Sequence, residues 1–301
     1  GTGLARAVSG EAAAMIEAVN ASGRPVVAVD VPSGLHADSG AVLGVATRAA
    51  LTVTFIGRKL GLYLGAAPEH VGHLVFDSLQ VPPETYSAAT PLARLLGETD
   101  VHEALPRRRR AAHKGDHGHV LVIGGGPGMP GAARLAGEAA LRSGAGLVTL
   151  AVHPENIGVV AARPELMCVA ARSASDLVTA LSRATVVAVG PGLGQSDWSR
   201  DMFEAALASG KPLVVDADAL NLLAAAPQRR ERWVLTPHPG EAARLLDITN
   251  AAVQSDRLAA VRQLQERFGG TVVLKGAGSI VHSGAGVPGI CDRGNPGMAA
   301  G

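Results

Sequence analysis

The stretch HVLVIGGGPGMPGAARLAGEAALRSGAGLVTLAV, residues 119–152, decides the fold class. It opens with a short apolar run, HVLVIGG, and closes with a second one, GLVTLAV. Between them, GAARLAGEAALRSG has the length and composition of a helix that stops at Gly144. Both apolar runs are continuous instead of alternating, as expected of strands that are buried on both faces of a parallel sheet. The stretch therefore predicts a strand–helix–strand unit of an α/β protein.

The same alternation continues toward the C-terminus. It predicts strands at 185–190, 211–218, 233–237 and 271–276, and a final, edge-like strand at 279–284. It predicts helices at 174–184, 198–210, 240–247 and 255–269.

The part of the chain before residue 119 alternates less strongly. A helix is expected at 11–20, and strands are expected at 24–30, 49–55 and 73–79. Residues 79–110 have no sustained period, and their Pro and Thr content and a run of Arg at 107–110 indicate a connecting segment. We therefore predict two α/β units. Residues 1–98 form one that looks incomplete, together with the linker, and residues 99–301 form one that is nearly complete.

The composition narrows the class of protein. Apolar residues make up 47% of the chain and charged residues 18%, which provides for a buried core and argues against disorder. The net charge of +1 gives no sign of a nucleic-acid or membrane-surface partner. The apolar runs are too short to span a membrane. Cys168 and Cys291 have no metal-ligand spacing, so we expect reduced thiols and a cytoplasmic protein.

A glycine pattern follows the first strand of the deciding stretch. Gly126, Gly128 and Gly131 match the G-x-G-x-x-G of dinucleotide-binding proteins. The match is weak because Pro127 and Pro130 have no N–H to offer a pyrophosphate, and because no acid stands at the tip of the next strand. A glycine-rich turn that lets another ligand approach the backbone is the alternative.

Other polar and glycine residues also follow strands, where open α/β sheets bind ligands. Gly190, Gly192 and Gly194 form either a ligand loop or a plain turn. Asp216 and Asp218 could hold a cation or orient a base, but Asp218 could equally cap the next helix.

Two more strand ends carry charged or titratable groups. His238 stands between two prolines, a position that favours ligand contact, and Glu241 follows in the first helical turn. Residues 275–279, KGAGS, offer a cation and small residues that can receive a phosphate through backbone N–H groups.

Three histidines stand just before or at the start of the strand that begins at residue 119. His113, His117 and His119 have a spacing that resembles a metal site. We favour a polar entry loop, because no further ligand is near in sequence.

The first unit has its own candidates. Asp30 ends a strand, and Pro32, Ser33 and Gly34 follow in a turn. Residues 1–7, GTGLARA, could form a turn that opens a helix, which makes them an anion-site candidate. Together they suggest a phosphate-bearing ligand and an acid–base carboxylate.

These two units in this order resemble the bifunctional NAD(P)H-hydrate repair enzymes. In the first unit the resemblance rests on GTGL, DVPSGLHADSG and TVTFIGRKLGLYLG. In the second it rests on HKGDHGHVLVIGG, MPGAARLAGEAALRSGAGLV, VGPGLG, VDADALN, TPHPGE, LKGAGS and GNPGMAAG. The resemblance covers essentially the whole chain. It implies a partial Rossmann-like epimerase domain followed by a ribokinase-like α/β dehydratase domain.

The resemblance also implies roles for matching residues. Asp30 would contact the substrate as the acid–base residue of the epimerase, and Ser33 would be a potassium ligand. The epimerase loop that holds the hydrated cofactor would comprise Gly1, Thr2, Gly3, Leu4, Ala5, Arg6 and Ala7. In the dehydratase, the hydrated cofactor would contact Ala132, Gly192 and His238. The nucleotide-phosphate loop would comprise Lys275, Gly276, Ala277, Gly278 and Ser279.

The implied chemistry is repair of hydrated NADH and NADPH (NADHX and NADPHX). The epimerase equilibrates the R and S hydrates. The dehydratase uses ADP to phosphorylate the ring hydroxyl of the S form, and elimination then restores the cofactor. K⁺ would serve the epimerase site and Mg²⁺ is a further candidate ion. We expect a homo-oligomer without a nucleic-acid or membrane partner.

Two other functions compete with repair. The first is a ribokinase-like kinase of a small vitamin alcohol, which would also use a glycine loop. The second is a pseudoenzyme that binds nucleotide without catalysis. DVPSG in the first unit argues against the kinase.

The two ends of the chain depart from the family pattern. In the family, the final glycine loop continues into Gly-x-Gly-Asp, whose Asp deprotonates the substrate hydroxyl, whereas this chain stops at Gly301. The earlier half of the epimerase domain is also missing. We therefore expect a fragment that by itself lacks dehydratase activity and also epimerase activity.

Overall fold

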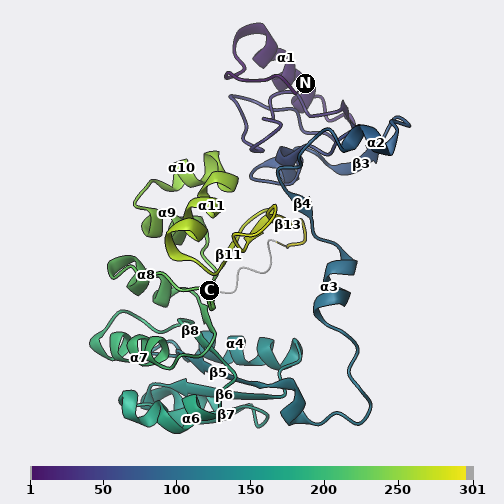
Figure 1. Cartoon of the computed structure of the whole chain (residues 1–301). Helices are drawn as coiled ribbons and strands as arrows, with labels where there is room; N and C mark the ends of the chain where they lie inside the picture. The colour runs from purple at the N-terminus through teal and green to yellow at the C-terminus, as the bar shows by residue number, and fades with distance from the viewer. Residues whose placement is uncertain (1, 296–301) are drawn as a thin grey trace.

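The computed structural model describes residues 2–295, which form two α/β units (Figure 1). The first carries a three-stranded sheet and the second a ten-stranded sheet. The first unit, coloured purple to blue, lies at one end of the molecule, and most of the larger sheet lies toward the other. The expected α/β class is confirmed.

The smaller sheet has the parallel order β1-β2-β3, from β1 (Val27–Val29), β2 (Leu51–Phe55) and β3 (His73–Asp77). Burial alternates along each strand, so one face is covered while Val27, Val29 and Val75 are exposed on the other. Helix α1 (Gly10–Ala21) precedes the sheet, and the short 3-10 helices η1 (Leu60–Leu62) and η2 (Ala67–Glu69) connect β2 to β3.

The larger sheet has the order β4-β13-β12-β11-β10-β9-β8-β5-β6-β7. Seven strands from β7 to β11 run parallel, and β12 is antiparallel to both of its neighbours. The chain goes from β5 to β6 on one side, and later places β8 on the other side of β5. The switch point of the sheet, where ligands bind in this architecture, therefore lies between β5 and β8. The strand bounds are β4 (Arg94–Leu95), β5 (His119–Ile123), β6 (Leu147–Val152), β7 (Met167–Ala170), β8 (Val186–Val189), β9 (Leu213–Val215), β10 (Trp233–Leu235), β11 (Thr271–Leu274), β12 (Ser279–His282) and β13 (Gly289–Cys291).

Successive residues of the central strand β5 enter two different cores. Val122 joins the cluster under α4 (Pro130–Arg142) and α5 (Ile157–Val160), whereas Leu121 and Ile123 join the larger cluster. Side chains alternate between the faces of a strand, so each face of the sheet has its own core. The larger core is covered by α6 (Val178–Arg183), α7 (Asp197–Ala208), α8 (Asp218–Ala225), α9 (Pro239–Leu246), α10 (Asn250–Ser255) and α11 (Arg257–Phe268).

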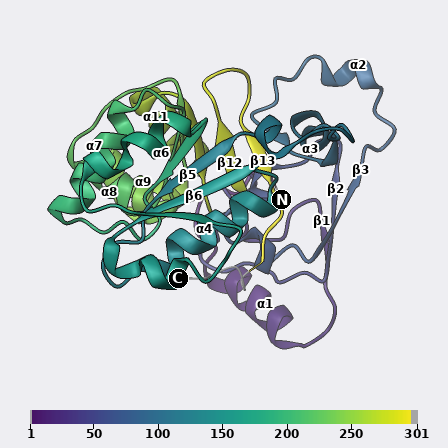
Figure 2. The same ribbon diagram turned by 90° about the horizontal axis from the view of Figure 1, so that it is seen from below.

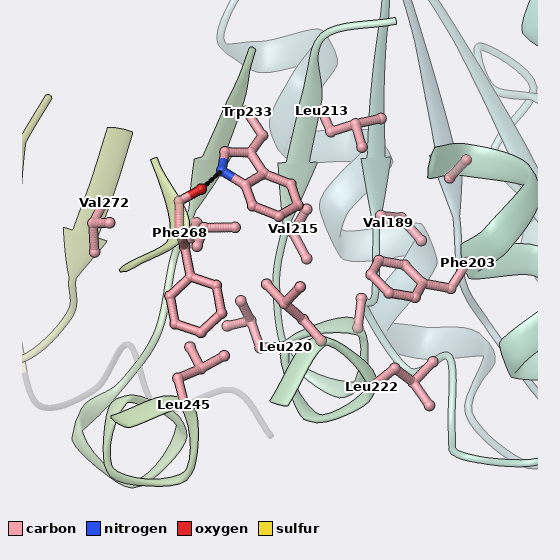
Figure 3. Close-up of a cluster of buried hydrophobic side chains, with 14 of the residues drawn as sticks. Val189, Phe203, Leu213, Val215, Leu220, Leu222, Trp233, Leu245, Phe268 and Val272 are labelled. Atoms are coloured by element: carbon pink, nitrogen blue, oxygen red, sulfur yellow. Dashed lines mark hydrogen bonds between the residues drawn. The ribbon is translucent and has the colours of Figure 1, made fainter. Parts of the chain in front are cut away.

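Large side chains interlock in this core (Figure 3). The Trp233 indole N–H donates to the Phe268 carbonyl over 3.2 Å, so the strand β10 is tied to the end of α11. Phe268, Leu220 and Val215 are almost fully buried beside them. Burial of each such side chain stabilises the fold by about 1.5–3 kcal/mol.

Several predicted elements need correction. The strand at 279–284 is wrong as a final edge strand, because β13 pairs with its outer side and β4 pairs with β13. The predicted connecting segment contains β4, α2 (Pro83–Tyr86) and α3 (Glu98–Ala104). Strand β7 and helix α10 were not predicted, and α8 was anticipated only as the helix that Asp218 could cap. The remaining short 3-10 helices are η3 (Lys114–His117), η4 (Pro154–Asn156) and η5 (Ala174–Leu177).

The two units touch each other. Figures 1 and 2 both place the hairpin β12–β13 on the side of the larger sheet that faces the first unit. Leu64, which is 1% exposed, belongs to the larger core cluster, and Leu60 and Tyr63 pack against that cluster. Within residues 2–295, the helices are all too short or too polar to cross a membrane.

Candidate active sites

Four loops follow the neighbouring strands β8, β9, β10 and β11, and together form the rim of the larger sheet. Their first residues are Gly190, Asp216, Thr236 and Lys275. Backbone hydrogen bonds tie these loops to their neighbours. The Thr236 N–H donates to Val215 O at the end of β9 over 3.1 Å, and the Lys275 N–H donates to Pro237 O in the loop after β10 over 2.8 Å. The sheet thus gathers candidates that are distant in sequence along one edge.

At the switch point, the loop after β5 packs directly on the loop after β8. The Gly125 N–H donates to Pro191 O over 3.0 Å, and the Gly126 N–H donates to Gly192 O over 2.7 Å. These N–H groups are therefore already engaged within the protein. Of the three glycines in the G-x-G-x-x-G match, Gly126 therefore has its N–H engaged within the protein and unavailable to a pyrophosphate.

The two predicted substrate contacts at the switch point lie side by side. A Cβ placed on Gly192 would lie 3.1 Å from the Cβ of Ala132 and 2.8 Å from Met129 O. Gly192 also has φ +60°, a conformation that L-residues with a side chain rarely adopt. A side chain at residue 192 would therefore close the space next to Ala132.

Charged side chains meet further along the rim. The Lys275 ammonium lies 2.6 Å from Asp216 Oδ1 and 3.9 Å from Glu241 Oε2. Glu241 is 5% exposed, and it also accepts a hydrogen bond from the His238 N–H over 2.7 Å. One cation and two carboxylates thus share the rim between β9 and β11.

His238 stands at the N-terminus of α9, as its predicted place at a strand tip requires. Its Nδ1 accepts from the Gly240 N–H over 3.0 Å, and its Nε2 lies 3.5 Å from Glu241 Oε1. The ring remains half exposed. His238 is therefore fixed in direction while its edge stays accessible to a ligand.

The sequence left two roles open for Asp218, a ligand or base contact and a helix cap, and the structure shows a different one. Helix α8 has no side-chain cap, and Asp218 Oδ2 accepts instead from the Gly194 N–H over 2.8 Å. Ala217 before it has φ +49°, which is strained for an alanine. Asp218 thus ties the loop after β8 to the start of α8.

The loop 275–279 is held from both sides. Gly276 has φ +138°, and a Cβ there would lie 2.9 Å from Arg257 Nη2. Gly278 has φ +66°, and a Cβ there would lie 2.0 Å from the carbonyl oxygen of Tyr63 in the first unit. At both positions a side chain would clash with its neighbours, and the positive φ also favours glycine.

Asp30 lies in a separate cluster of the first unit. It has φ +69°, and its Oδ1 accepts from Lys59 Nζ, from Thr54 Oγ1 over 3.1 Å and from the Phe55 N–H over 3.2 Å. Burial by itself raises the pKa of the Asp30 carboxyl, but the bonds from Lys59, Phe55 and Thr54 outweigh it. The pKa of Asp30 therefore lies below the usual aspartate value, and the group is a carboxylate at neutral pH.

The other predicted residues of the first unit are more exposed. Ser33 lies in a turn, where its carbonyl accepts from the Thr47 N–H over 2.8 Å and its side chain stays exposed. Residues 2–7 are mostly exposed, and the partners of the Asp30 carboxylate all come from elsewhere. Gly1 and the loop residues 296–301 lie outside the described residues.

His113 and His119, two of the three histidines with metal-like spacing, have separate partners. His113 Nδ1 accepts from the Gly115 N–H over 3.1 Å, and His119 Nε2 lies 2.8 Å from Thr149 Oγ1. Burial lowers the pKa of His119. Within the described residues, no group of three or more His, Cys, Asp or Glu side chains is placed to hold a metal.

Sequence reasoning assigned no role to Lys59, Arg257 or Asn156. Lys59 pairs with Asp30 from a distant loop, and Asn156 donates to the carbonyls of Gly125 and Gly126 over 3.0 and 2.6 Å. The contacts of Lys59 and Asn156 cannot be recognised from the residues next to them in sequence. Arg257 could have been noticed, because a cation in the first turn of a helix lies at the unfavourable, positive end of the helix dipole.

Family models match both units. A model described as NAD(P)H-hydrate dehydratase matches residues 120–301, and one described as YjeF-related protein N-terminus matches residues 1–61. The first match contains the rim, and the second contains Asp30 and Lys59.

Named relatives match across the two units. The bifunctional NAD(P)H-hydrate repair enzyme Nnr of Coxiella burnetii is 50% identical over 100% of this chain and 62% of its own length. That of Escherichia coli K12 is 46% identical, over 100% of this chain and 58% of its own. The chain thus spans about three fifths of the length of these relatives.

Solved structures match the larger unit. A ribokinase-like superfamily protein of Enterococcus faecalis V583 aligns with TM-score 0.63 and 30% identity, over 71% of this chain and 76% of that one. The ADP/ATP-dependent NAD(P)H-hydrate dehydratase of Bacillus subtilis, co-crystallised with ATP and Mg²⁺, aligns with TM-score 0.60 and 27% identity, over 69% and 76%. By sequence and by fold, the chain belongs to the NAD(P)H-hydrate dehydratase family.

Proposed function

We propose that the protein repairs hydrated NADH and NADPH. Its larger unit removes water from the S hydrate at the expense of ADP, and its first unit interconverts the R and S hydrates. The names of the relatives give NAD(P)H-hydrate repair as their activity, and we propose the same activity for this protein.

The continuous rim after β8, β9, β10 and β11 carries the dehydratase proposal. It puts the Gly192–Ala132 surface at the switch point and the Lys275 loop in the same row of loops. Between them stand Asp216 and His238. A hydrated dinucleotide at the first position and a nucleotide diphosphate at the second would share one edge of the sheet.

The reaction needs positive charge where the phosphoryl group moves. Hydroxide is a poor leaving group, so the ring hydroxyl first takes the terminal phosphoryl group of ADP and gives up its proton. Phosphate then leaves with the electrons of the C–O bond, and the neighbouring ring carbon loses a proton, which restores the ring double bond. ADP and the hydrate give AMP, phosphate and the reduced cofactor. Lys275 and the loop behind it would stabilise the charge on the phosphoryl oxygens. The side chain of His238 would orient the hydrate.

We propose that Mg²⁺ accompanies the nucleotide, as in the crystals of the Bacillus subtilis enzyme. Oxygen donors suit this ion, and it typically takes one or two carboxylates with substrate phosphates completing its shell. Asp216 and Glu241, both next to Lys275, offer such donors. The ion would neutralise phosphate charge.

In the first unit, we propose Asp30 as the acid–base group of epimerisation. Its lowered pKa keeps it ionised at neutral pH, which is the form that can accept a proton, and Lys59 holds the carboxylate in place. Thr2–Ala7 would contact the hydrate, and the exposed hydroxyl of Ser33 would ligate K⁺. Replacement of K⁺ by Na⁺ should slow epimerisation in the wild type, and Ser33→Ala should remove that difference.

The decisive experiment uses the protein encoded by the complete reading frame. The S hydrate is incubated with and without ADP, and dihydronicotinamide absorbance, AMP and phosphate are followed together. We expect equal amounts of restored cofactor, AMP and phosphate, only when ADP is present. Phosphorylation of a vitamin alcohol with no effect on the hydrate would instead identify a kinase. Binding of ADP without turnover of either substrate would identify a pseudoenzyme.

The remaining assignments are tested separately. We propose a cytoplasmic location, which the free thiols of Cys168 and Cys291 favour, and assembly as a homo-oligomer. Fractionation of the cells and light scattering of the purified protein measure these two properties.

A further inference from the structure

A buried cation lies directly beneath the loop after β11. Arg257 is the first residue of α11 and is only 2% exposed. Burial lowers its pKa to about 10, so the guanidinium still carries its charge at neutral pH. In the described part of the chain, no carboxylate lies within ion-pair distance of Arg257, and its Nε has no hydrogen-bond partner. Burial of a charge without a counter-charge raises the free energy of the folded state, so a compensating interaction is expected at Arg257.

The partners of Arg257 are all carbonyl oxygens of one segment, the last residue of β11 and the loop that follows it. Its Nη2 donates to Leu274 O over 3.2 Å and to Lys275 O over 3.0 Å, and its Nη1 donates to Ala277 O. The fork of the guanidinium therefore holds three peptide groups of the loop in fixed directions. A lysine, with a single ammonium, does not reproduce this geometry.

The direction of these carbonyls fixes the opposite side of the loop. In a planar trans peptide, the C=O of one residue and the N–H of the next point in opposite directions. Since the carbonyls of Lys275 and Ala277 face Arg257, the N–H groups of Gly276 and Gly278 face away from it. Neither N–H donates a hydrogen bond within residues 2–295, whereas the N–H of Lys275 donates to Pro237 O.

We propose that Arg257 is a positioning residue for the polyphosphate of the nucleotide. It turns the free N–H groups of Gly276 and Gly278 toward the phosphate oxygens, and its charge favours an anion on the far side of the loop. A bound phosphate would supply the counter-charge that the protein lacks here. The inference rests on the proposed function, because it assigns the nucleotide to this loop.

Two variants of Arg257 and one of its neighbour test the proposal. Arg257→Lys keeps the charge and Arg257→Gln removes it, and neither bridges three carbonyls. Gly276→Ala keeps the guanidinium but pushes against it, since the new Cβ would lie 2.9 Å from Nη2. Arg262→Gln is the matched control, because this exposed arginine of the same helix also donates to a carbonyl, Leu92 O, over 3.3 Å.

Calorimetry measures the Kd of ADP, and steady-state kinetics measure the KM of the hydrate at saturating ADP. We expect Arg257→Lys, Arg257→Gln and Gly276→Ala each to weaken ADP binding roughly 10- to 100-fold, the loss that corresponds to one or two charge-assisted hydrogen bonds. The KM of the hydrate should stay within about twofold in all of them, because the hydrate would bind at the other end of the rim. A structural defect alone would change both constants.

The outcomes separate this inference from the proposed function. If the wild type binds no ADP, the proposed function fails. If the wild type binds ADP and the Arg257 and Gly276 variants bind it equally well, the positioning role is wrong while the proposed function stands. If Arg257→Gln does not fold, Gly276→Ala decides, and unchanged ADP binding in it overturns the proposal.

Discussion

At the scale of single residues, the two candidate sites each depend on a lysine paired with an aspartate. Lys59 reaches Asp30 in the first unit, and Lys275 reaches Asp216 on the rim. In both pairs the aspartate directly follows a strand, and the lysine comes from another part of the chain. The sequence indicated Asp30, Asp216 and Lys275 by their positions, but neither pairing, because contacts across distant segments leave no local pattern.

Removal of the lysine should change the titration of Asp30. Lys59→Met deletes a hydrogen bond and a cation that lower the pKa of Asp30, so this pKa should rise. The ionised Asp30 stabilises the fold above its unfolded pKa, and that stability is lost as the pH falls through the lower folded pKa. In the variant this contribution should shrink, and the acid limb of the proposed epimerisation should move to higher pH. Carboxyl NMR titration of wild type and variant measures the shift, and an unmoved Asp30 resonance would contradict it.

Lys275 should matter for nucleotide binding. Lys275→Met removes a charged donor that would contact phosphate, and we expect the Kd of ADP to rise about 10- to 100-fold. Lys211→Met at the other end of β9 is the control, because Lys211 only approaches Ser182 O. Equal ADP affinity in both variants would remove Lys275 from the site.

At the scale of elements, the sequence predicted those whose pattern is local. The strands β5, β6 and β8 and the helices α4 and α7 lie where their apolar runs and stop glycines placed them. Strands β4 and β13 were missed because they contain two and three residues, and pairing defines them instead of periodicity. Helix α8 was expected only as the helix that Asp218 could cap, without bounds, because its eight residues give little periodicity.

Close packing between neighbouring loops sets the shape of the rim. A Cβ on Gly190 would lie 1.8 Å from Asp216 O, so the loops after β8 and β9 touch through backbone alone. The candidate residues of the rim could be predicted from the sequence because each follows a strand. The contacts between these residues could not be predicted, because the contacts depend on the order of the strands in the sheet.

Gly190→Ala should therefore destabilise the fold more than a comparable glycine substitution. Gly210 also has a positive φ, but a Cβ there would meet nothing within 4 Å. Gly210→Ala should cost about 1–2 kcal/mol through backbone strain alone. Gly190→Ala should cost roughly 1–3 kcal/mol more through overpacking. Urea unfolding of both variants gives the difference, and equal midpoints would show that the loops separate freely.

At the scale of the whole molecule, the first unit completes the surroundings of the second. Leu64 fills a place in the larger core, and the Tyr63 carbonyl lies against the loop at Gly278. The division at residues 98 and 99 predicted from sequence stays a prediction, and β4 lies before it although it pairs within the larger sheet.

Truncation of Leu64 should therefore destabilise the larger unit. Leu64→Ala should lower the free energy of unfolding by about 2–5 kcal/mol, as for other buried leucines. Both tryptophans, Trp198 and Trp233, lie in the larger unit, so their fluorescence reports on it alone. Val19→Ala on the exposed side of α1 is the control. A tryptophan unfolding midpoint that is unchanged in Leu64→Ala would mean that the units melt independently.

The pairing of β4 with β13 has a consequence for synthesis on the ribosome. Arg94 and Leu95 are translated well before Gly289 and Ile290, with which they align. Parallel strands β5 to β11 can assemble as they emerge, but β4 has no partner until the hairpin β12–β13 has been made. The strand that is translated first in the larger sheet is therefore among the last to join it.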